Sequence, residues 1–510
     1  MPEQVIGKLK KSVLPQWKMC FFAALIMGVI AHFYKITNWL PNWDSLVFRY
    51  DAQNMLALGR WLLPVVCAPS SFYDLPWISG LMSIIFHALG AVCICKIFDV
   101  QKNTTAVIIG ALVATFPAVT SVMLYNYVAD GYAIAFAFSC LAAMFAAKEK
   151  PNYIASVIMI TLAVGTYQAY ITVTIMLLLV YLIIELTQKK SDLMKLVKKS
   201  GCFLLTGIIG MGLYYFILMA LLRITGIALL EYQGFDSAAS FEGIKLREAF
   251  YIIKNIFVNY FFDFSKGINV FAVTNVIVFA VILVLYFIDI IKNKLSLLKF
   301  IMLCICVILL PVGAGVLVFM NSEIDYHNLM KMGFLGYYLL FFLQYEKAEF
   351  KNNKLNLIKL WTILIVTVIL IFNSVIIANV SYHNLNMAYQ KSYGTLIRIV
   401  DRIEQTEGTE NCDTVAILGY LPDSEAYSVN MPPDITGTTE GYILRADDET
   451  VSQSVVCSAI NDYCGKNYKF VAGKEKEIIS NKASSLDCWP AKDSIAVIDN
   501  VIVIKLGDER

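Results

Sequence analysis

The chain has 510 residues, of which 58% are hydrophobic and 16% are charged, and its mean hydropathy is +0.65. Such a composition excludes an ordinary soluble globular protein and predicts an integral membrane protein. The net charge of +2 hides an asymmetry, because residues 381–510 carry 12 Lys and Arg against 20 Asp and Glu. The membrane part is therefore basic and the tail acidic.

Eleven apolar runs are candidates for helices that cross about 30 Å of hydrocarbon. They lie at about 18–38, 76–97, 104–124, 130–147, 153–166, 168–187, 202–222, 268–290, 297–319, 329–345 and 356–379. We therefore expect a polytopic α-helical membrane protein, with residues 1–380 as the transmembrane domain. The first run is expected to stay in place as a signal anchor. The fifth and sixth runs meet at Gly165-Thr166-Tyr167-Gln168 and could instead form one kinked helix or a re-entrant pair.

The loops on one side of these runs are rich in lysine, and the loops on the other side are acidic. Because cytoplasmic loops carry an excess of positive charge, the pattern predicts a cytoplasmic N-terminus. The expected outer loops are 39–75, 223–267 and 320–328. An odd number of spans also places the tail outside, whereas an even number would move it to the other side.

The tail, residues 381–510, has the pattern of a small α/β extracytoplasmic domain. Its expected elements are an amphipathic helix at 385–403, a buried strand at 414–418, a loop rich in Pro, Asp, Gly and Thr at 421–449, and a hairpin at 494–506. Its cysteines permit two disulfides with three possible connectivities, and the sequence does not choose among them. These are Cys412, Cys457, Cys464 and Cys488. With only four His in the chain, a structural zinc site is not expected.

The first outer loop contains two carboxylates seven residues apart, Asp44 and Asp51. Seven residues are about two helical turns, so both side chains share one face if this segment is helical, and Asp44 is also suited to cap the helix. Paired carboxylates at a membrane surface favour a glycosyltransferase that uses a lipid-linked sugar. One carboxylate could deprotonate the acceptor hydroxyl while nearby cations stabilise the leaving phosphate. The alternative is a solvated cap or loop charge.

Three other outer positions carry residues that could bind substrate. Arg60 and Trp61 follow the acid pair, although Trp at a membrane interface is usually an anchor and Arg beside it usually contacts headgroups. Tyr167 and Gln168 lie where two spans meet, and Gln in hydrocarbon usually bonds across helices. Asp130, at the start of the fourth span, fits a simple helix cap or a second acid at the site.

The last outer loop before the tail has the densest polar cluster beside a span, at 323–331. His327 and Lys331 are four residues apart, so on an α-helix they share a face and could bind a donor phosphate together. A lysine that snorkels to the interface is the alternative for Lys331. Arg223, at the outer end of the seventh span, is the other candidate for the phosphate.

Four passages of the chain carry a family resemblance. They are residues 44–61 ending in Gly-Arg-Trp, 117–132 ending in Ala-Asp-Gly-Tyr, 166–170 reading Thr-Tyr-Gln-Ala-Tyr, and 488–506 opening with Cys-Trp-Pro-Ala-Lys-Asp-Ser-Ile. Together they resemble the bacterial membrane glucosyltransferases that decorate O-antigen and related surface polysaccharides, often called the Gtr or glucosyltransferase II family. Lys331 departs from this family, whose members more often have Arg in that region.

The resemblance implies a GT-C-like architecture in a bacterial inner membrane, with the active site facing the periplasm or cell exterior. It implies transfer of a hexose, glucose in this family, from a polyprenyl-phosphate carrier to a surface glycan such as O-antigen, with inversion expected by analogy. Asp44 is then expected to be the general base, and Asp51 to orient the sugar or the base, or to bind a divalent metal. The reverse assignment is also open. A donor synthase and a flippase are implied as functional partners.

Two other classes stay open from the residues alone. An O-antigen polymerase or ligase would have a similar number of spans, but we would expect its large loop and arginines late in the chain. A transporter of lipid-linked sugar would predict charged residues within the spans, or two similar halves with broken helices. Nucleic-acid binding is not expected, because membrane topology explains the lysine clusters.

Overall fold

The fold is that of a computed structural model, which describes residues 13–41, 43–47, 55–70, 74–189, 191–230, 246–264, 269–320, 324–348, 354–421, 443–445 and 449–507. Asp51 and most of the expected loop 421–449 lie outside the described residues. The described residues form two compact units. The first contains residues 13–38 and the described part of 55–379, and the second contains 39–47 and the described part of 380–507.

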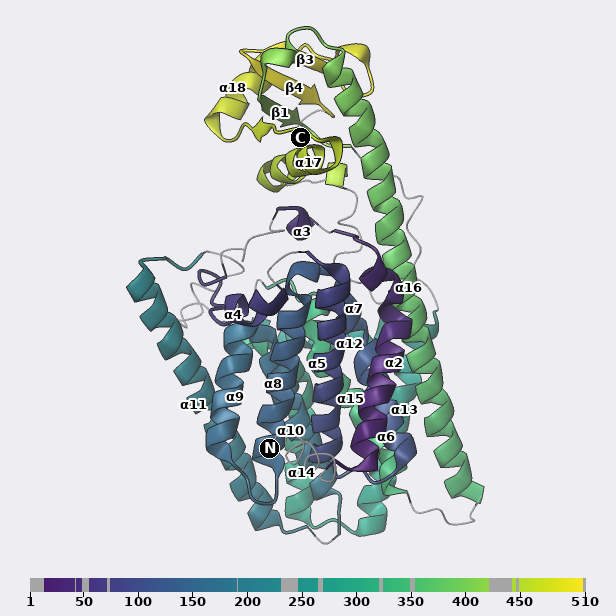
Figure 1. The fold of residues 1–510 in the computed structure, drawn as a ribbon. Coiled ribbons are helices and arrows are strands. Elements are labelled where there is room, and N and C mark those ends of the chain that lie inside the picture. Colours follow the sequence, from purple (N-terminus) through teal and green to yellow (C-terminus); the bar gives the residue numbers. More distant parts are fainter. Residues whose placement is uncertain are drawn as a thin grey trace, which may run out of the picture. The chain divides into compact units, whose positions relative to one another are not determined.

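The first unit is a bundle of helices (Figure 1). In chain order, with η for a 3-10 helix, these are α2 (Pro15–Thr37), α4 (Leu63–Cys67), η1 (Ala68–Ser70), α5 (Pro76–Ile97), α6 (Asn103–Thr115), α7 (Pro117–Leu124), η2 (Asn126–Val128), α8 (Ala129–Ala147), α9 (Tyr153–Thr166), η3 (Gln168–Tyr170), α10 (Ile171–Leu186), α11 (Leu193–Thr225), α12 (Leu246–Phe262), α13 (Val270–Asn293), α14 (Leu297–Ala314), η5 (Val316–Phe319), η6 (Asn328–Phe334) and α15 (Leu335–Lys347). Helix α16 (Lys354–Glu404) begins in this unit and ends in the second. Helix α8 is nearly enclosed, because it packs on α5, α9 and α10, whereas α11 leaves most of its apolar side chains exposed.

Eight helices of the described part are long and apolar enough to cross a membrane, or nine if the bent pair α6 and α7 counts as one span. They indicate a membrane-embedded protein, but the expected count of eleven is not confirmed. Helix α9 has 14 residues, which at 1.5 Å per residue reach only about 21 Å. The run expected at 329–345 is divided into the 3-10 helix η6 and the 13-residue α15.

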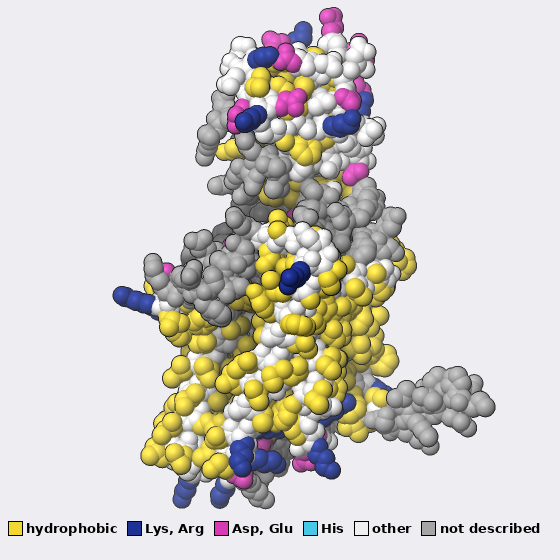
Figure 2. Space-filling model, turned by 90° about the vertical axis from the view of Figure 1, so that its left-hand side faces the viewer, with side chains coloured by type: hydrophobic (Ala, Val, Ile, Leu, Met, Phe, Trp, Pro, Cys, Tyr) yellow, Lys and Arg dark blue, Asp and Glu magenta, His cyan; other side chains and the backbone are white. Residues whose placement is uncertain are grey.

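Lysines gather at one end of the helical unit, where Figure 2 shows dark blue side chains, while yellow apolar side chains cover the flank. Several of them cap helix C-termini, whose last carbonyls have no partner within the helix. The Lys102 ammonium donates to the carbonyls of Tyr345, Glu346 and Ala348 at 2.7, 2.8 and 2.7 Å. Lys199 caps α8 in the same way. The charges expected to orient the chain therefore also complete its helices.

The second unit contains a four-stranded sheet in the order β2-β1-β4-β3. Its strands are β1 (Thr414–Leu418), β2 (Lys469–Phe470), β3 (Ile495–Ile498) and β4 (Val501–Lys505). Strand β1 is parallel to β2 and β4, and β3 is antiparallel to β4. The end of α16 and helix α17 (Glu449–Cys464) cover one face of the sheet, and α18 (Lys474–Lys482) covers the other. Asp499 and Asn500 have φ of 52° and 63°, which suits a tight hairpin turn between β3 and β4.

The second unit also includes three short 3-10 helices and the short helix α3. The 3-10 helices are η7 (Thr409–Asn411), η9 (Ile443–Arg445) and η10 (Lys492–Ser494). Helix α3 (Trp43–Val47) carries Asp44. Leu46 of α3 is buried in the core formed by α16, α17 and the sheet, and Trp43 packs against that core. The expected outer loop 39–75 is therefore divided between the two units.

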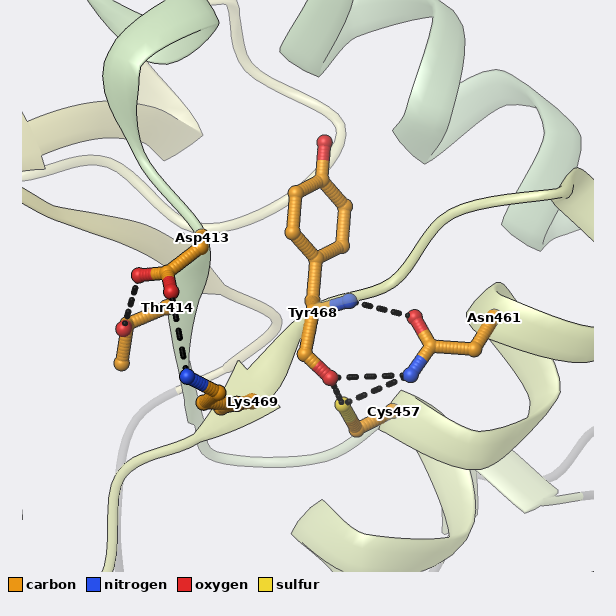
Figure 3. Close-up of polar contacts among 6 residues, drawn as sticks. All are labelled: Asp413, Thr414, Cys457, Asn461, Tyr468 and Lys469. Atoms are coloured by element: carbon orange, nitrogen blue, oxygen red, sulfur yellow. Dashed lines mark hydrogen bonds and ion pairs between the residues drawn. The ribbon is translucent and has the colours of Figure 1, made fainter.

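All twelve cysteines are thiols, and none forms a disulfide. In Figure 3 the Cys457 thiol donates to the Tyr468 carbonyl at 3.2 Å. The neighbouring Asn461 side chain exchanges two hydrogen bonds of 2.8 Å with the backbone of Tyr468. Burial raises the pKa of the Cys457 thiol to about 11, which keeps it protonated and unreactive near neutral pH.

Candidate functional site

Three interruptions of the helices meet in the part of the first unit away from the lysines. The first lies between α6 and α7, which bend by 41°. Pro117 explains this break, because proline disfavours helical backbone in the residue before it, and Phe116 has ψ of 137°. The second lies at Tyr167, between α9 and η3, and the third is η6, which packs against α7, η3 and α10. Broken helices at membrane depth are tolerated where they line a cavity or are enclosed in protein, so we take this region as the candidate site.

Arg60 lies on a tyrosine stack built from two helical segments. Its guanidinium is 5.0 Å from the centroid of the Tyr167 ring, and its Nη1 donates to the Tyr132 hydroxyl at 3.2 Å. The rings of Tyr132 and Tyr167 stack with centroids 4.3 Å apart. We call Arg60, Tyr132 and Tyr167 the arginine–tyrosine cluster. It combines a half-buried cation with two almost fully buried rings, and the guanidinium is suited to an anionic group such as a phosphate.

Gln168 fixes the turn that presents Arg60. Its Nε2 donates to the Leu58 carbonyl at 2.8 Å and to the Tyr214 hydroxyl at 3.3 Å. The Tyr214 hydroxyl in turn donates to the Gly59 carbonyl at 3.0 Å. Gly59 has φ of 75°, a conformation that favours glycine. These are hydrogen bonds across helices, the alternative that the sequence left open for Gln168, and they act on the backbone beside Arg60.

Trp61 holds the same turn against the end of α9. A Cβ on Gly165 would lie 2.5 Å from two atoms of the Trp61 indole, so the ring rests directly on the glycine. The Leu62 amide donates to the Gly165 carbonyl at 2.8 Å. Only glycine leaves room for the indole here, and the position of Trp61 therefore depends on Gly165.

We expect Gly165→Ala to lower the free energy of unfolding by about 1–3 kcal/mol, because the added methyl overpacks the indole contact. The matched control is Gly207→Ala in α11, where a Cβ meets no atom within 4 Å and alanine should be neutral or slightly stabilising. Thermal unfolding of the purified protein in detergent gives the comparison. Equal melting temperatures for the two variants would show that Trp61 moves aside without cost.

Asp130 opens helix α8 and is fully buried. Its Oδ1 accepts a hydrogen bond from the Gly131 amide at 3.0 Å, and its Oδ2 has no hydrogen bond from the described residues. Cys67 and Ser70 lie beside the carboxyl group, but the Ser70 hydroxyl donates to the Cys67 carbonyl at 2.8 Å. A buried polar oxygen without a donor is unfavourable. In the described part of the first unit, Asp130 is therefore suited to accept a hydroxyl of a bound substrate.

Sequence reasoning missed a buried polar group near this site. Lys35 in the last turn of α2, Asp74 before α5 and Asn126 in η2 are 1%, 8% and 1% exposed. Asn126 Nδ2 donates to Asp74 Oδ1, and the Asp74 carboxylate acts electrostatically on the Lys35 ammonium. We call these three residues the lysine network. The signal that could have revealed it is an acid directly before one apolar run and a lysine at the end of another.

The α-helical pairing expected for His327 and Lys331 is wrong. His327 precedes η6, a 3-10 helix in which Lys331 has φ of −86° and ψ of 16°. With three residues per turn, positions four apart point about 120° away from each other. His327 Nδ1 instead binds Asp325 Oδ2 at 3.0 Å. Burial lowers the pKa of His327 below its usual 6.5; the Asp325 charge opposes this shift and the Lys331 charge adds to it. At pH 7 the cation here is therefore Lys331.

This pKa shift predicts a pH dependence of stability. The folded protein disfavours protonated His327, so below the usual pKa of 6.5 the unfolded chain binds more protons and the free energy of unfolding falls. We expect the melting temperature of the wild type to drop more between about pH 7.5 and 5.5 than that of His327→Gln, which does not titrate in this range. If the melting temperatures of the two proteins fell in parallel with pH, His327 would have the same pKa in the folded and unfolded states.

The profile of one protein family, described as glucosyl transferase GtrII, matches residues 33–343. The chain belongs to the GtrII glucosyltransferase family. No curated protein and no solved structure matches it. The match spans 311 of 510 residues and confirms the family resemblance noted in the sequence. It includes the arginine–tyrosine cluster, the lysine network, Asp130 and η6, while most of the second unit lies beyond it.

Three candidate residues of this glucosyltransferase are not part of the arginine–tyrosine cluster as the described first unit defines it. Asp44 is half-buried in α3 of the second unit, and Asp51 lies outside the described residues. Arg223 is exposed in the last turn of α11, about 13.5 Å along the helix axis from Tyr214. Among the described residues, no three His, Cys, Asp or Glu side chains are grouped to hold a metal ion.

Proposed function

We propose that this membrane glucosyltransferase takes glucose from a polyprenyl-phosphate carrier and transfers it to a cell-surface glycan, such as O-antigen, on the extracytoplasmic face of a bacterial inner membrane. The observation that carries the proposal is the arginine–tyrosine cluster, which lies away from the lysine-rich end of the helical unit. Lysine-rich ends mark the cytoplasmic side. An enzyme acting on the other side has no nucleotide sugar within reach, and a lipid-linked sugar supplies both the hexose and its phosphate leaving group.

In the proposed reaction Arg60 binds the donor phosphate and stabilises its charge as it leaves, with Lys331 as a second cation. A carboxylate removes the proton from the acceptor hydroxyl while its oxygen attacks the anomeric carbon and the bond to phosphate breaks. This direct displacement inverts the anomeric centre. Asp44 or Asp51 is the base that the sequence favours, and the available Oδ2 of Asp130 supports that residue as a further acid at the site. A synthase and a flippase would supply the donor.

The test is transfer of radiolabelled glucose from synthetic polyprenyl-phosphate-glucose by purified enzyme, with host glycan as acceptor. We compare Asp44→Asn, Asp51→Asn and Asp130→Asn. Loss of the general base should lower kcat roughly 100- to 10,000-fold while donor binding is retained. If all three variants keep wild-type kcat, the carboxylate mechanism is wrong. No transfer by the wild type from any of several lipid-linked sugars would contradict the proposed donor.

Arg60 and Arg223 provide a matched pair for the phosphate ligand. We expect Arg60→Ala to raise the KM for the donor about tenfold or more, because a hydrogen bond to a charged group is worth about 1.5–3 kcal/mol. Arg223→Ala, on the exposed end of α11, should change this KM less than twofold. The reverse result would assign the phosphate to Arg223.

A further inference from the structure

We infer that the lysine network is a positioning device for glucosyl transfer: Lys35, Asp74 and Asn126 hold the start of helix α8 in place. Its kinetic test rests on the proposed function, and its structural test does not. None of the three residues belongs to the arginine–tyrosine cluster, and all three are almost fully buried.

The network connects three segments that are distant in the sequence, through one hydrogen bond between Asn126 and Asp74 and an electrostatic interaction between Asp74 and Lys35. Lys35 comes from the last turn of α2, Asp74 from the residues before α5, and Asn126 from η2. The ends of α2 and α5 are already in close contact, because a Cβ on Gly80 would lie 2.3 Å from Cγ2 of Ile36. Asp74 then extends this contact to η2 through its hydrogen bond from Asn126.

The electrostatics of the network indicate a purpose other than stability. Two charges taken out of water lose their hydration, and replacing such a pair by apolar residues of similar volume is often neutral or stabilising. A charged pair with a hydrogen-bonded amide does, however, fix distance and direction more sharply than apolar packing does.

The element that the network fixes leads directly into the candidate site. The 3-10 helix η2 leads directly into α8, with Val128 (φ −131°, ψ 6°) as the junction. Asp130 lies four residues after Asn126, and Tyr132 lies six residues after Asn126. A shift or rotation of η2 therefore moves the Asp130 carboxylate and also the Tyr132 hydroxyl that accepts the hydrogen bond from Arg60.

The kinetic test uses two variants and one control. Lys35→Met removes the ammonium on which the buried Asp74 carboxylate acts, so the melting temperature should fall. Lys35→Met/Asp74→Asn removes both charges and keeps an acceptor for Asn126, so the melting temperature should return toward that of the wild type. We expect kcat for glucose transfer to fall about tenfold or more in both variants, with donor KM changed less than threefold. The control, Lys102→Met, removes a helix-capping lysine at the other end of the bundle and should lower the melting temperature without lowering kcat.

The structural test measures the reactivity of Cys67 and needs no substrate. The Cys67 side chain is fully buried and lies against the start of α8, since a Cβ on Gly131 would be 2.6 Å from its Sγ. N-ethylmaleimide should modify Cys67 slowly in the wild type and in Lys102→Met. Displacement of α8 should speed the reaction about tenfold or more in both Lys35 variants, as followed by peptide mass spectrometry.

Recovery of wild-type kcat and wild-type Cys67 reactivity in the double variant would overturn the inference, because the pair would then serve stability alone. Unchanged kcat and unchanged Cys67 reactivity in Lys35→Met would overturn it as well. If the wild type transfers no glucose, the proposed donor fails, and the Cys67 rates alone decide whether the network positions α8.

Discussion

A backbone N–H or C=O group inside hydrocarbon has no water to bond with, and this constraint governs the site more than any single contact. Wherever a helix is interrupted, side chains form the hydrogen bonds that the backbone groups would otherwise lack. Gln168 and Tyr214 satisfy the carbonyls of Leu58 and Gly59, and His32 Nε2 bonds the carbonyl of Ala114 at 2.9 Å where α6 ends. The polar side chains near the breaks therefore form hydrogen bonds with backbone groups. These hydrogen bonds fix the backbone that carries the candidate reactive residues.

This constraint explains which features of the chain could be predicted from its sequence. Apolar runs and the hairpin around Asp499-Asn500 are local patterns, so most helices and three of the four strands lie near their expected positions. The division of 329–345 into η6 and α15 was not predictable, because the run is mostly apolar and η6 packs on α7, η3 and α10, which are distant in the sequence. The error over His327 and Lys331 has the same origin.

Site residues were predictable by type but not by arrangement. Arg60 and Tyr167 were selected because a cation and an aromatic ring suit a sugar phosphate, and the structure does place them together. The third member of the arginine–tyrosine cluster, Tyr132, is 72 residues from Arg60. No local sequence pattern connects such distant positions. The lysine network joins three separate segments, and it was not predicted from the sequence for the same reason. Asp44 and Asp51 stay a prediction from sequence.

The lysine caps have a consequence for how the chain is made. Lys102 bonds carbonyls that lie 243 to 246 residues further along the chain. At about 5–20 residues per second, these carbonyls emerge from the ribosome roughly 12–50 seconds after Lys102 does. During that interval these carbonyls do not yet exist, and the charge of the ammonium can influence on which side of the membrane the α5–α6 turn stays. Only afterwards does Lys102 cap the C-terminus of α15. The same side chain can therefore act first during insertion and later as a helix cap in the folded bundle.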